Sequence, residues 1–153
     1  MVAKLTILVG PPAAGKSTWR QHYKGEVIST DSIRNEEFGV QYDPRIEPLV
    51  WRRAYQRLAR ALAQGKDVCF DATNVTKARR RPLINMARAA GAQVEAVVIN
   101  PGLEVLLKRD AARPPGKKVG REVLLNIYRQ LELPTLDEGF DRIEFVNNSL
   151  KDM

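Results

Sequence analysis

One nine-residue segment constrains this chain more than any other feature of its sequence. Residues 10–18 read Gly-Pro-Pro-Ala-Ala-Gly-Lys-Ser-Thr and match the P-loop pattern, in which a glycine-bounded turn precedes a lysine and a hydroxyl residue. The segment follows the apolar run 5–9 and precedes a possible helix start. This order predicts a buried strand, a turn whose backbone N–H groups converge, and a helix N-terminus that favours anionic charge.

The P-loop pattern carries definite expectations about ligands. A phosphate-binding turn would use every residue of the segment: Gly10, Pro11, Pro12, Ala13, Ala14, Gly15, Lys16, Ser17 and Thr18. We expect Lys16 to reach the β- and γ-phosphates of ATP or another nucleoside triphosphate, and the Ser17 hydroxyl to hold Mg²⁺. Ala13 and Ala14 stand where Gly and Ser are frequent, and we expect both at negative φ. The alternative is a glycine turn that binds nothing.

Length and charge limit the remaining possibilities. A chain of 153 residues suits a single domain, 1–153. Its 25 basic and 18 acidic residues give a net charge of +7, which favours a polyanionic partner such as nucleic acid, although high arginine use can also reflect genome composition or thermal adaptation. The lone cysteine, Cys69, excludes an intramolecular disulfide and favours a reducing, cytoplasmic setting. No signal peptide or membrane-spanning run is visible, so no membrane partner is expected.

Apolar runs alternate with helical patterns, which predicts an α/β fold with a parallel five-stranded sheet and helices on both faces. The expected strands cover residues 5–9, 27–29, 68–70, 94–99 and 143–146. The expected helices cover residues 46–64, 83–90, 103–112 and 121–131. Because Pro82 suits the first turn of a helix better than its interior, we expect residues 73–81 to be largely loop. Residues 109–120, basic and interrupted by Pro and Gly, are predicted to form a lid.

Two carboxylates close predicted strands, where ligands gather in open α/β sheets. Asp31 ends the second strand and is a candidate to accept the proton of an attacking hydroxyl, with a helix N-cap as the alternative. Asp71 ends the third strand and is predicted to hold Mg²⁺ or to orient the acceptor; the alternative is a structural carboxylate bonded to Thr73 or Asn74. Arg34 lies three residues after Asp31 and is predicted to clamp an acceptor phosphate, or else is simply solvated.

Arginines supply the predicted charge-neutralising groups. Arg109 and Arg113 are spaced so that one helical face can present both guanidinium groups to the nucleotide phosphates. The alternative for Arg109 is an exposed partner of an acidic side chain. Arg113 adjoins the basic lid and is the candidate to stabilise charge in the transition state. The run 79–81 is all arginine and follows the Asp71 loop, so Arg79 and Arg80 are predicted to contact a nucleic-acid backbone. A solvated helix face is the alternative for that run.

The order of these elements resembles the kinase module of polynucleotide 5′-kinases, which the T-even phage enzyme and the animal kinase/phosphatase share. The matching segments include the P-loop, Thr-Asp-Ser-Ile-Arg at 30–34, Asp-Ala-Thr-Asn at 71–74, Met-Ala-Arg-Ala-Ala-Gly at 86–91, Ile-Tyr-Arg-Gln at 127–130 and Pro-Thr-Leu-Asp-Glu-Gly-Phe at 134–140. Arg109 with Arg113 matches as well. The resemblance therefore spans nearly the whole chain.

The resemblance implies a P-loop kinase fold and ATP-dependent transfer of the γ-phosphate to the 5′-hydroxyl end of single-stranded or end-exposed DNA or RNA. It implies that Lys16 and Ser17 serve the phosphates and Mg²⁺, that Asp31 is the general base and that Arg113 is the lid arginine. Arg34 matches the phage form alone, in which an arginine contacts the acceptor-side phosphate. There is no room for a 3′-phosphatase module, so a kinase alone is expected.

Two other functions remain open at this point. Related P-loop kinases phosphorylate small molecules such as nucleotides, sugars and UDP-sugars, and several share the Asp-x-Thr-Asn element. A nucleotide-gated binding module without acceptor chemistry is the second alternative. Asp31 argues against such a module, because a switch needs no base at that strand end.

Overall fold

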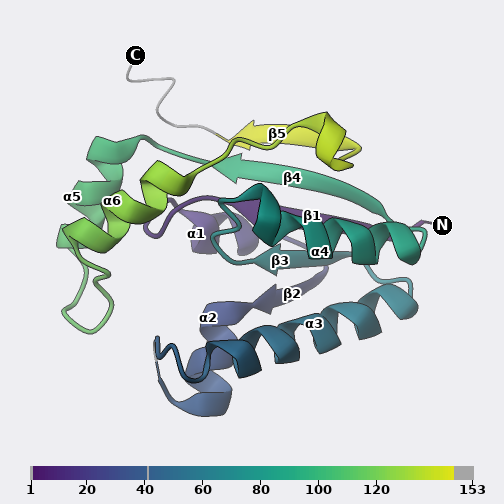
Figure 1. Ribbon diagram of the computed structural model, residues 1–153, viewed down its shortest axis with the longest axis horizontal. Coiled ribbons are helices and arrows are strands. Elements are labelled where there is room, and N and C mark those ends of the chain that lie inside the picture. The colour runs from purple at the N-terminus through teal and green to yellow at the C-terminus, as the bar shows by residue number, and fades with distance from the viewer. Residues whose placement is uncertain (1, 41, 147–153) are drawn as a thin grey trace.

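The computed structural model describes residues 2–40 and 42–146 and shows one five-stranded parallel sheet. The strands are β1 (Lys4–Val9), β2 (Glu26–Ser29), β3 (Val68–Asp71), β4 (Gln93–Ile99) and β5 (Arg142–Val146). Their order across the sheet is β2-β3-β1-β4-β5, and every neighbouring pair is parallel (Figure 1). The predicted α/β class and the five predicted strands are thus confirmed, with strand bounds that shift by one residue at most.

Helices cover both faces of the sheet, as expected (Figure 1). They are α1 (Lys16–Arg20), α2 (Thr30–Ile33), the π-helical turn η1 (Arg34–Phe38), α3 (Glu47–Ala63), α4 (Lys77–Ala89), α5 (Leu103–Ala111), α6 (Arg121–Gln130) and the 3₁₀ turn η2 (Leu136–Glu138). Helices α3 and α4 pack on one face, and α1, α5 and α6 lie against the other. Among the described residues, no helix combines the length and the apolar character that crossing a bilayer requires.

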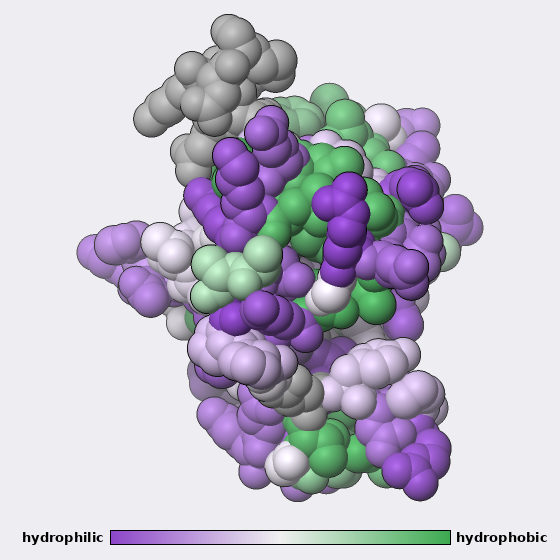
Figure 2. Space-filling model, turned by 90° about the vertical axis from the view of Figure 1, so that its left-hand side faces the viewer, coloured by the Kyte–Doolittle hydropathy of each residue, from purple (hydrophilic) through white to green (hydrophobic). Residues whose placement is uncertain are grey.

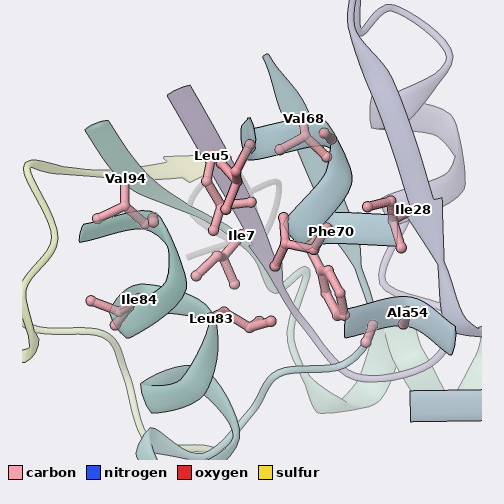
Figure 3. Packing of buried hydrophobic residues seen from close by; sticks show 14 of the residues in the cluster. Leu5, Ile7, Ile28, Ala54, Val68, Phe70, Leu83, Ile84 and Val94 are labelled. Carbon is pink, nitrogen blue, oxygen red and sulfur yellow. The ribbon is translucent and has the colours of Figure 1, made fainter. Parts of the chain in front are cut away.

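The central strand β1 explains why its sequence reads as one apolar run. Successive side chains of a strand point to opposite faces, so a strand covered on both sides is apolar on both, and its buried Thr6 donates its hydroxyl to Glu95. Leu5 and Ile7 pack toward α3 and α4 with Phe70 of β3 and Leu83 of α4 (Figure 3), whereas Leu8 joins the cluster on the other face. β1 is thus held by the cores on both faces of the sheet, and the P-loop follows it directly.

Cys69 of β3 lies fully buried in the second cluster. Burial raises the pKa of its thiol to about 12, so the thiolate that cysteine chemistry requires is suppressed. A packing role for this residue follows, in agreement with its position in an apolar strand.

The start of α4 differs from the prediction. We expected residues 73–81 to be largely loop, but the helix already begins at Lys77 and contains Pro82. The side chain of Thr76 accepts a hydrogen bond from the Arg79 N–H at 3.2 Å and thereby caps the helix. Pro82 is exposed, and its missing N–H removes one bond from a helix whose inner face is held by the core.

The predicted lid is tied to the domain at its end. Asp110 is buried on α5, and its carboxylate accepts hydrogen bonds from the backbone N–H groups of Val119 and Gly120, both at 3.0 Å. The mostly exposed residues between α5 and α6 therefore form a short loop whose C-terminal end is held by Asp110. This geometry restricts any lid movement to the turns near residues 113–118.

Candidate active site

The carboxyl ends of β1, β2 and β3 form one edge of the sheet and carry the predicted site residues. In the strand register, Leu8 of β1 and Ser29 of β2 both lie level with Asp71 of β3. The P-loop follows β1, and Asp31 lies two residues after the end of β2. Figure 2 shows this side of the molecule, where hydrophilic residues surround patches of exposed hydrophobic surface.

Close packing and backbone conformation explain the residues of the P-loop. A Cβ on Gly10 would lie 2.4 Å from the carbonyl oxygen of Ile99, so the loop can approach β4 only with glycine there. Gly15 has a φ of 109°. Ala13 has a φ of 70°, so our expectation of negative φ is wrong for Ala13 and is confirmed for Ala14 alone. The left-handed turn costs Ala13 roughly 1–2 kcal/mol, and the buried methyl group offsets part of that cost by packing in the core.

Lys16 folds its ammonium group back over the P-loop. Its Nζ donates hydrogen bonds to the carbonyl oxygens of Gly10 at 2.5 Å and Pro11 at 3.2 Å. Burial lowers the pKa of Lys16 to about 8, although the charges of Asp71 and Asp31 act in the opposite direction. The nearby carboxylates therefore compensate the ammonium charge only in part. An anion such as a nucleotide phosphate would restore that balance, so the loop fits the group that its sequence implies.

Asp71 lies beside an arginine that sequence reasoning missed. Arg20 of α1 donates a hydrogen bond to the Asp71 carboxylate at 3.0 Å. Burial raises the pKa of Asp71, and the charges of Lys16 and Arg20 oppose that rise. The spacing along the chain could have indicated Arg20, because it lies four residues after Lys16 and therefore on the same face of a helix. The alternative role of Asp71, a structural carboxylate bonded to Thr73 or Asn74, is wrong, because neither residue bonds its carboxylate.

The residues present fit a magnesium ion that is shared with a nucleotide. Ser17 is exposed at the start of α1, and the Asp71 carboxylate reaches the same edge of the sheet. Mg²⁺ is usually bound through one or two protein oxygens together with substrate phosphates and water. No cluster of three or more His, Cys, Asp or Glu side chains occurs among residues 2–40 and 42–146, so a metal site made wholly of such residues is not found there.

Asp31, Arg34 and Glu47 form a connected group at the end of β2. Asp31 is 87% exposed and accepts a hydrogen bond from Arg34 Nη1 at 2.6 Å. Arg34 also donates two hydrogen bonds to Glu47, both at 2.6 Å, which fix the direction of its guanidinium group. The N-cap of α2 is Ser29, whose side chain accepts from Ser32 N–H, so the N-cap alternative for Asp31 is wrong. Asp31 thus keeps a carboxylate oxygen open to an acceptor.

The two lid arginines occupy different positions. Arg109 donates from Nη1 to the carbonyl oxygens of Ala13 at 3.3 Å and Ala14 at 3.1 Å, and so it braces the outside of the P-loop. Arg113 is half-buried, and its charge lowers the pKa of Lys16. The structure therefore brings both arginines to the P-loop side of the sheet edge, where a nucleotide phosphate would lie.

The arginine run 79–81 divides between surface and core. Arg80 is fully buried; it donates to both carboxylate oxygens of Glu138 at 2.9 and 3.0 Å and to the carbonyl oxygen of Asn74 at 2.9 Å. Its predicted contact with a nucleic-acid backbone is wrong, because all three nitrogens of its guanidinium group donate hydrogen bonds inside the fold. Arg79 is exposed, with its guanidinium carbon 4.2 Å from the centre of a Trp51 ring. Arg79 therefore keeps access to a ligand.

The Pro-Thr-Leu-Asp-Glu-Gly-Phe segment at 134–140 has a structural role in this chain. Thr135 and Glu138 form a reciprocal capping box around η2, and Gly139 ends that turn with a φ of 116°. Glu138 also holds Arg80, which joins this segment to α4. In this chain the segment therefore anchors the C-terminal region to the domain.

The sheet order, the P-loop after the first strand and the carboxylates at neighbouring strand ends define a P-loop protein with a kinase fold. The family model described as "AAA domain" matches residues 5–134, and the chain belongs to this family. A candidate kinase from Chloroflexus aurantiacus has a similar structure, with a TM-score of 0.75, 19% identity, and coverage of 100% of this chain and 92% of that one.

Two further similar proteins carry names that describe RNA substrates or RNA repair. The L-seryl-tRNA(Sec) kinase of Methanococcus maripaludis is 29% identical over 146 residues, which cover 90% of this chain and 56% of that protein. A chain of the Pnkp1/Rnl/Hen1 RNA repair complex is 24% identical with a TM-score of 0.74, over 85% of this chain and 44% of that one. The present chain thus spans little more than half of the kinase's length. The likeness to solved structures shows the fold.

Proposed function

We propose that this protein is an ATP-dependent polynucleotide 5′-hydroxyl kinase that acts on single-stranded or end-exposed DNA or RNA. One observation carries the proposal: an exposed carboxylate, Asp31, lies at a strand end on the same edge of the sheet as the P-loop, where the Lys16 ammonium group lies over the loop carbonyl oxygens. A nucleotide switch has no use for a proton acceptor there, whereas phosphoryl transfer to a hydroxyl has. A reducing, cytoplasmic setting belongs to the same proposal.

The chemistry follows from the positions of these groups. Lys16 and the P-loop N–H groups bind the β- and γ-phosphates, and Ser17 with Asp71 would hold the Mg²⁺ that neutralises phosphate charge. The acceptor oxygen forms a bond to the γ-phosphorus as the bond to the bridging β–γ oxygen breaks. The acceptor proton passes to Asp31, and ADP leaves. Arg113 stabilises negative charge on the transferred group.

Acceptor recognition is assigned to two arginines. Arg34 is held by Glu47 with its guanidinium beside Asp31, so a phosphate next to the reacting 5′ end would meet a fixed planar donor. Arg79 lies in the first turn of α4, which follows the loop after Asp71. Neither arginine would read the hydrogen-bonding edges of bases, which suits an end-processing enzyme that accepts many sequences.

A kinase of a small molecule, such as a nucleotide, a sugar or a UDP-sugar, is the second candidate. The observation that favours it is the pairing of Arg34 with two carboxylates, Asp31 and Glu47, which compensates its charge without any phosphate. An acceptor site of this kind can also receive an uncharged hydroxyl compound. Acceptor preference separates the two candidates directly.

The test uses γ-labelled ATP and a panel of acceptors: 5′-hydroxyl DNA, 5′-hydroxyl RNA, nucleosides and sugars. The proposal expects label at oligonucleotide 5′ ends, and it expects Lys16→Ala and Ser17→Ala to abolish that label while circular dichroism remains unchanged. Arg60→Ala, an exposed change on α3, is the matched control and should retain activity. Label on sugars or nucleosides alone would transfer the assignment to the second candidate. Full activity of both P-loop variants would refute the phosphate-binding role.

A further inference from the structure

A groove with aromatic and basic walls begins at the same edge of the sheet as the proposed active site. It lies between α3 and α4 and has a volume of about 510 Å³. Trp51, Tyr55 and Arg52 line it from α3, and Met86 lines it from α4. Both helices start at the edge that carries the P-loop and Asp31 and run away from it across the sheet (Figure 1). Pro48, at the start of the groove lining, directly follows Glu47, the partner of Arg34, so the groove begins beside the acceptor side of the site.

Layered planar groups stand at the active-site end of this groove. The Trp51 ring lies 5.7 Å from the ring of Phe70, the residue before Asp71, and 5.8 Å from the ring of Tyr55. The guanidinium of Arg79 covers the Trp51 ring at 4.2 Å. Arg79 thus presents a flat cationic surface supported from below, and Tyr55 presents a second ring further along the groove. Nucleobases stack on both kinds of surface, whatever the sequence.

The charge of the two helices fits a polyanion. Helix α3 contains four arginines and one acidic residue, Glu47, and α4 contains five basic residues and no acidic one. Glu47 is engaged by Arg34 at the helix start. Within the part of the chain that the structure describes, Arg52 and Arg79 take part in no ion pair, and no carboxylate lines the groove. Their charges are thus available to phosphates.

We propose that this groove binds the single-stranded continuation of the acceptor polynucleotide, with bases stacked on Arg79 and Tyr55 and phosphates next to Arg52. The proposal rests on the proposed function, because the groove holds the strand whose 5′ end reaches Asp31. From Pro48 to Ala59 the lining of α3 extends for about 17 Å at the helical rise of 1.5 Å per residue. At the 3.4 Å spacing of stacked bases this length accommodates about five nucleotides.

The first experiment measures binding without catalysis. Labelled single-stranded oligonucleotides of eight nucleotides are titrated with protein in the absence of ATP, and fluorescence anisotropy is followed at several salt concentrations. Tyr55→Leu keeps an apolar side chain against the core but removes the ring, and it should weaken binding about 5- to 150-fold, the range expected for one stacked base. Arg79→Lys keeps the charge without the plane and should also weaken binding.

Arg52→Gln tests the phosphate contact. One lost contact should reduce the slope of log affinity against log salt by about 0.7 for a single strand. Arg60→Gln is the matched control, because Arg60 is an exposed arginine of the same helix that lines a different groove beside β2. The slope should stay unchanged in that variant. Equal slopes for both variants would overturn the assignment of Arg52.

Kinetics with acceptors of increasing length separate this inference from the function on which it rests. In the wild type, the KM for the acceptor should fall as the strand grows from two to about six nucleotides. In Tyr55→Leu the KM should be high at every length, while kcat for a dinucleotide stays unchanged. Normal phosphorylation of long strands by Tyr55→Leu would refute the groove alone. A wild-type protein that phosphorylates no 5′-hydroxyl end would refute the proposed function.

Discussion

Replacing Arg80 with methionine tests whether this buried arginine holds the fold together. The change removes two hydrogen bonds to Glu138 and one to the carbonyl oxygen of Asn74, and it leaves a Glu138 side chain that is only 9% exposed without its cation. Breaking a buried ion pair on one side costs about 3–5 kcal/mol. For a domain of this size each kcal/mol lowers the melting temperature by about 2–4 °C. The melting temperature of Arg80→Met should therefore fall by roughly 6–20 °C.

Urea denaturation and thermal melting measure this loss, and Arg79→Met provides a matched control next to it in the sequence. Arg79→Met should change stability by less than about 1 kcal/mol, because the side chain is exposed. Adding Glu138→Leu to Arg80→Met should recover part of the loss, since the unpaired carboxylate is then gone. A stable Arg80→Met protein with weakened oligonucleotide binding would refute the structural role and restore the acceptor contact.

Four further outcomes follow from the site. Nucleotide affinity should fall as the pH rises above about 8, because the lowered pKa of Lys16 allows its ammonium group to lose a proton there. Isothermal titration calorimetry from pH 7 to about 9.5 measures this change, and Lys16→Met should abolish the pH dependence. Between about pH 8 and 10.5 the unfolded chain keeps a proton on Lys16 that the folded protein has lost. The free energy of unfolding should therefore increase as the pH rises through this range. Gly10→Ala should lower stability by about 1–3 kcal/mol, because the new Cβ would displace the Ile99 carbonyl of β4. Arg113→Lys should reduce turnover with little effect on ATP affinity, since a single ammonium cannot replace a bidentate guanidinium; retained turnover would contradict its role at the transferred phosphate.

Much of the fold could be predicted because its signals are local. The run Leu5–Val9 is apolar except for Thr6, as suits a strand buried on both faces, and the glycine-bounded turn after it fixes where the strand ends. The strand order was not predictable in the same way, since β1 pairs with β3 and β4, which lie far along the chain. Pro82 misled the prediction for α4 because its local preference was outweighed by the Thr76 cap and the core contacts of the helix.

The site residues that follow strand ends could be predicted from the sequence. Those whose role depends on a partner far along the chain could not. The P-loop and Asp31 follow directly from strand ends, and the structure brings them to one edge. The partners of Asp71 and Arg80 lie 51 and 58 residues away, so neither the Arg20 bridge nor the burial of Arg80 could be read from neighbouring residues. The positive φ of Ala13 escaped prediction because alanine rarely adopts it.

The most direct test of the central claim is the rate at which Asp31→Asn transfers the γ-phosphate of ATP to a 5′-hydroxyl oligonucleotide. Asparagine keeps the size of the side chain and can still accept the hydrogen bond from Arg34, but it cannot take the acceptor proton. The rate should fall by about 10²- to 10⁴-fold at saturating substrates, while ATP affinity and melting temperature remain those of the wild type. A near-normal rate would contradict the assignment of Asp31 as general base, and the acceptor site would then have to be sought beside Asp71.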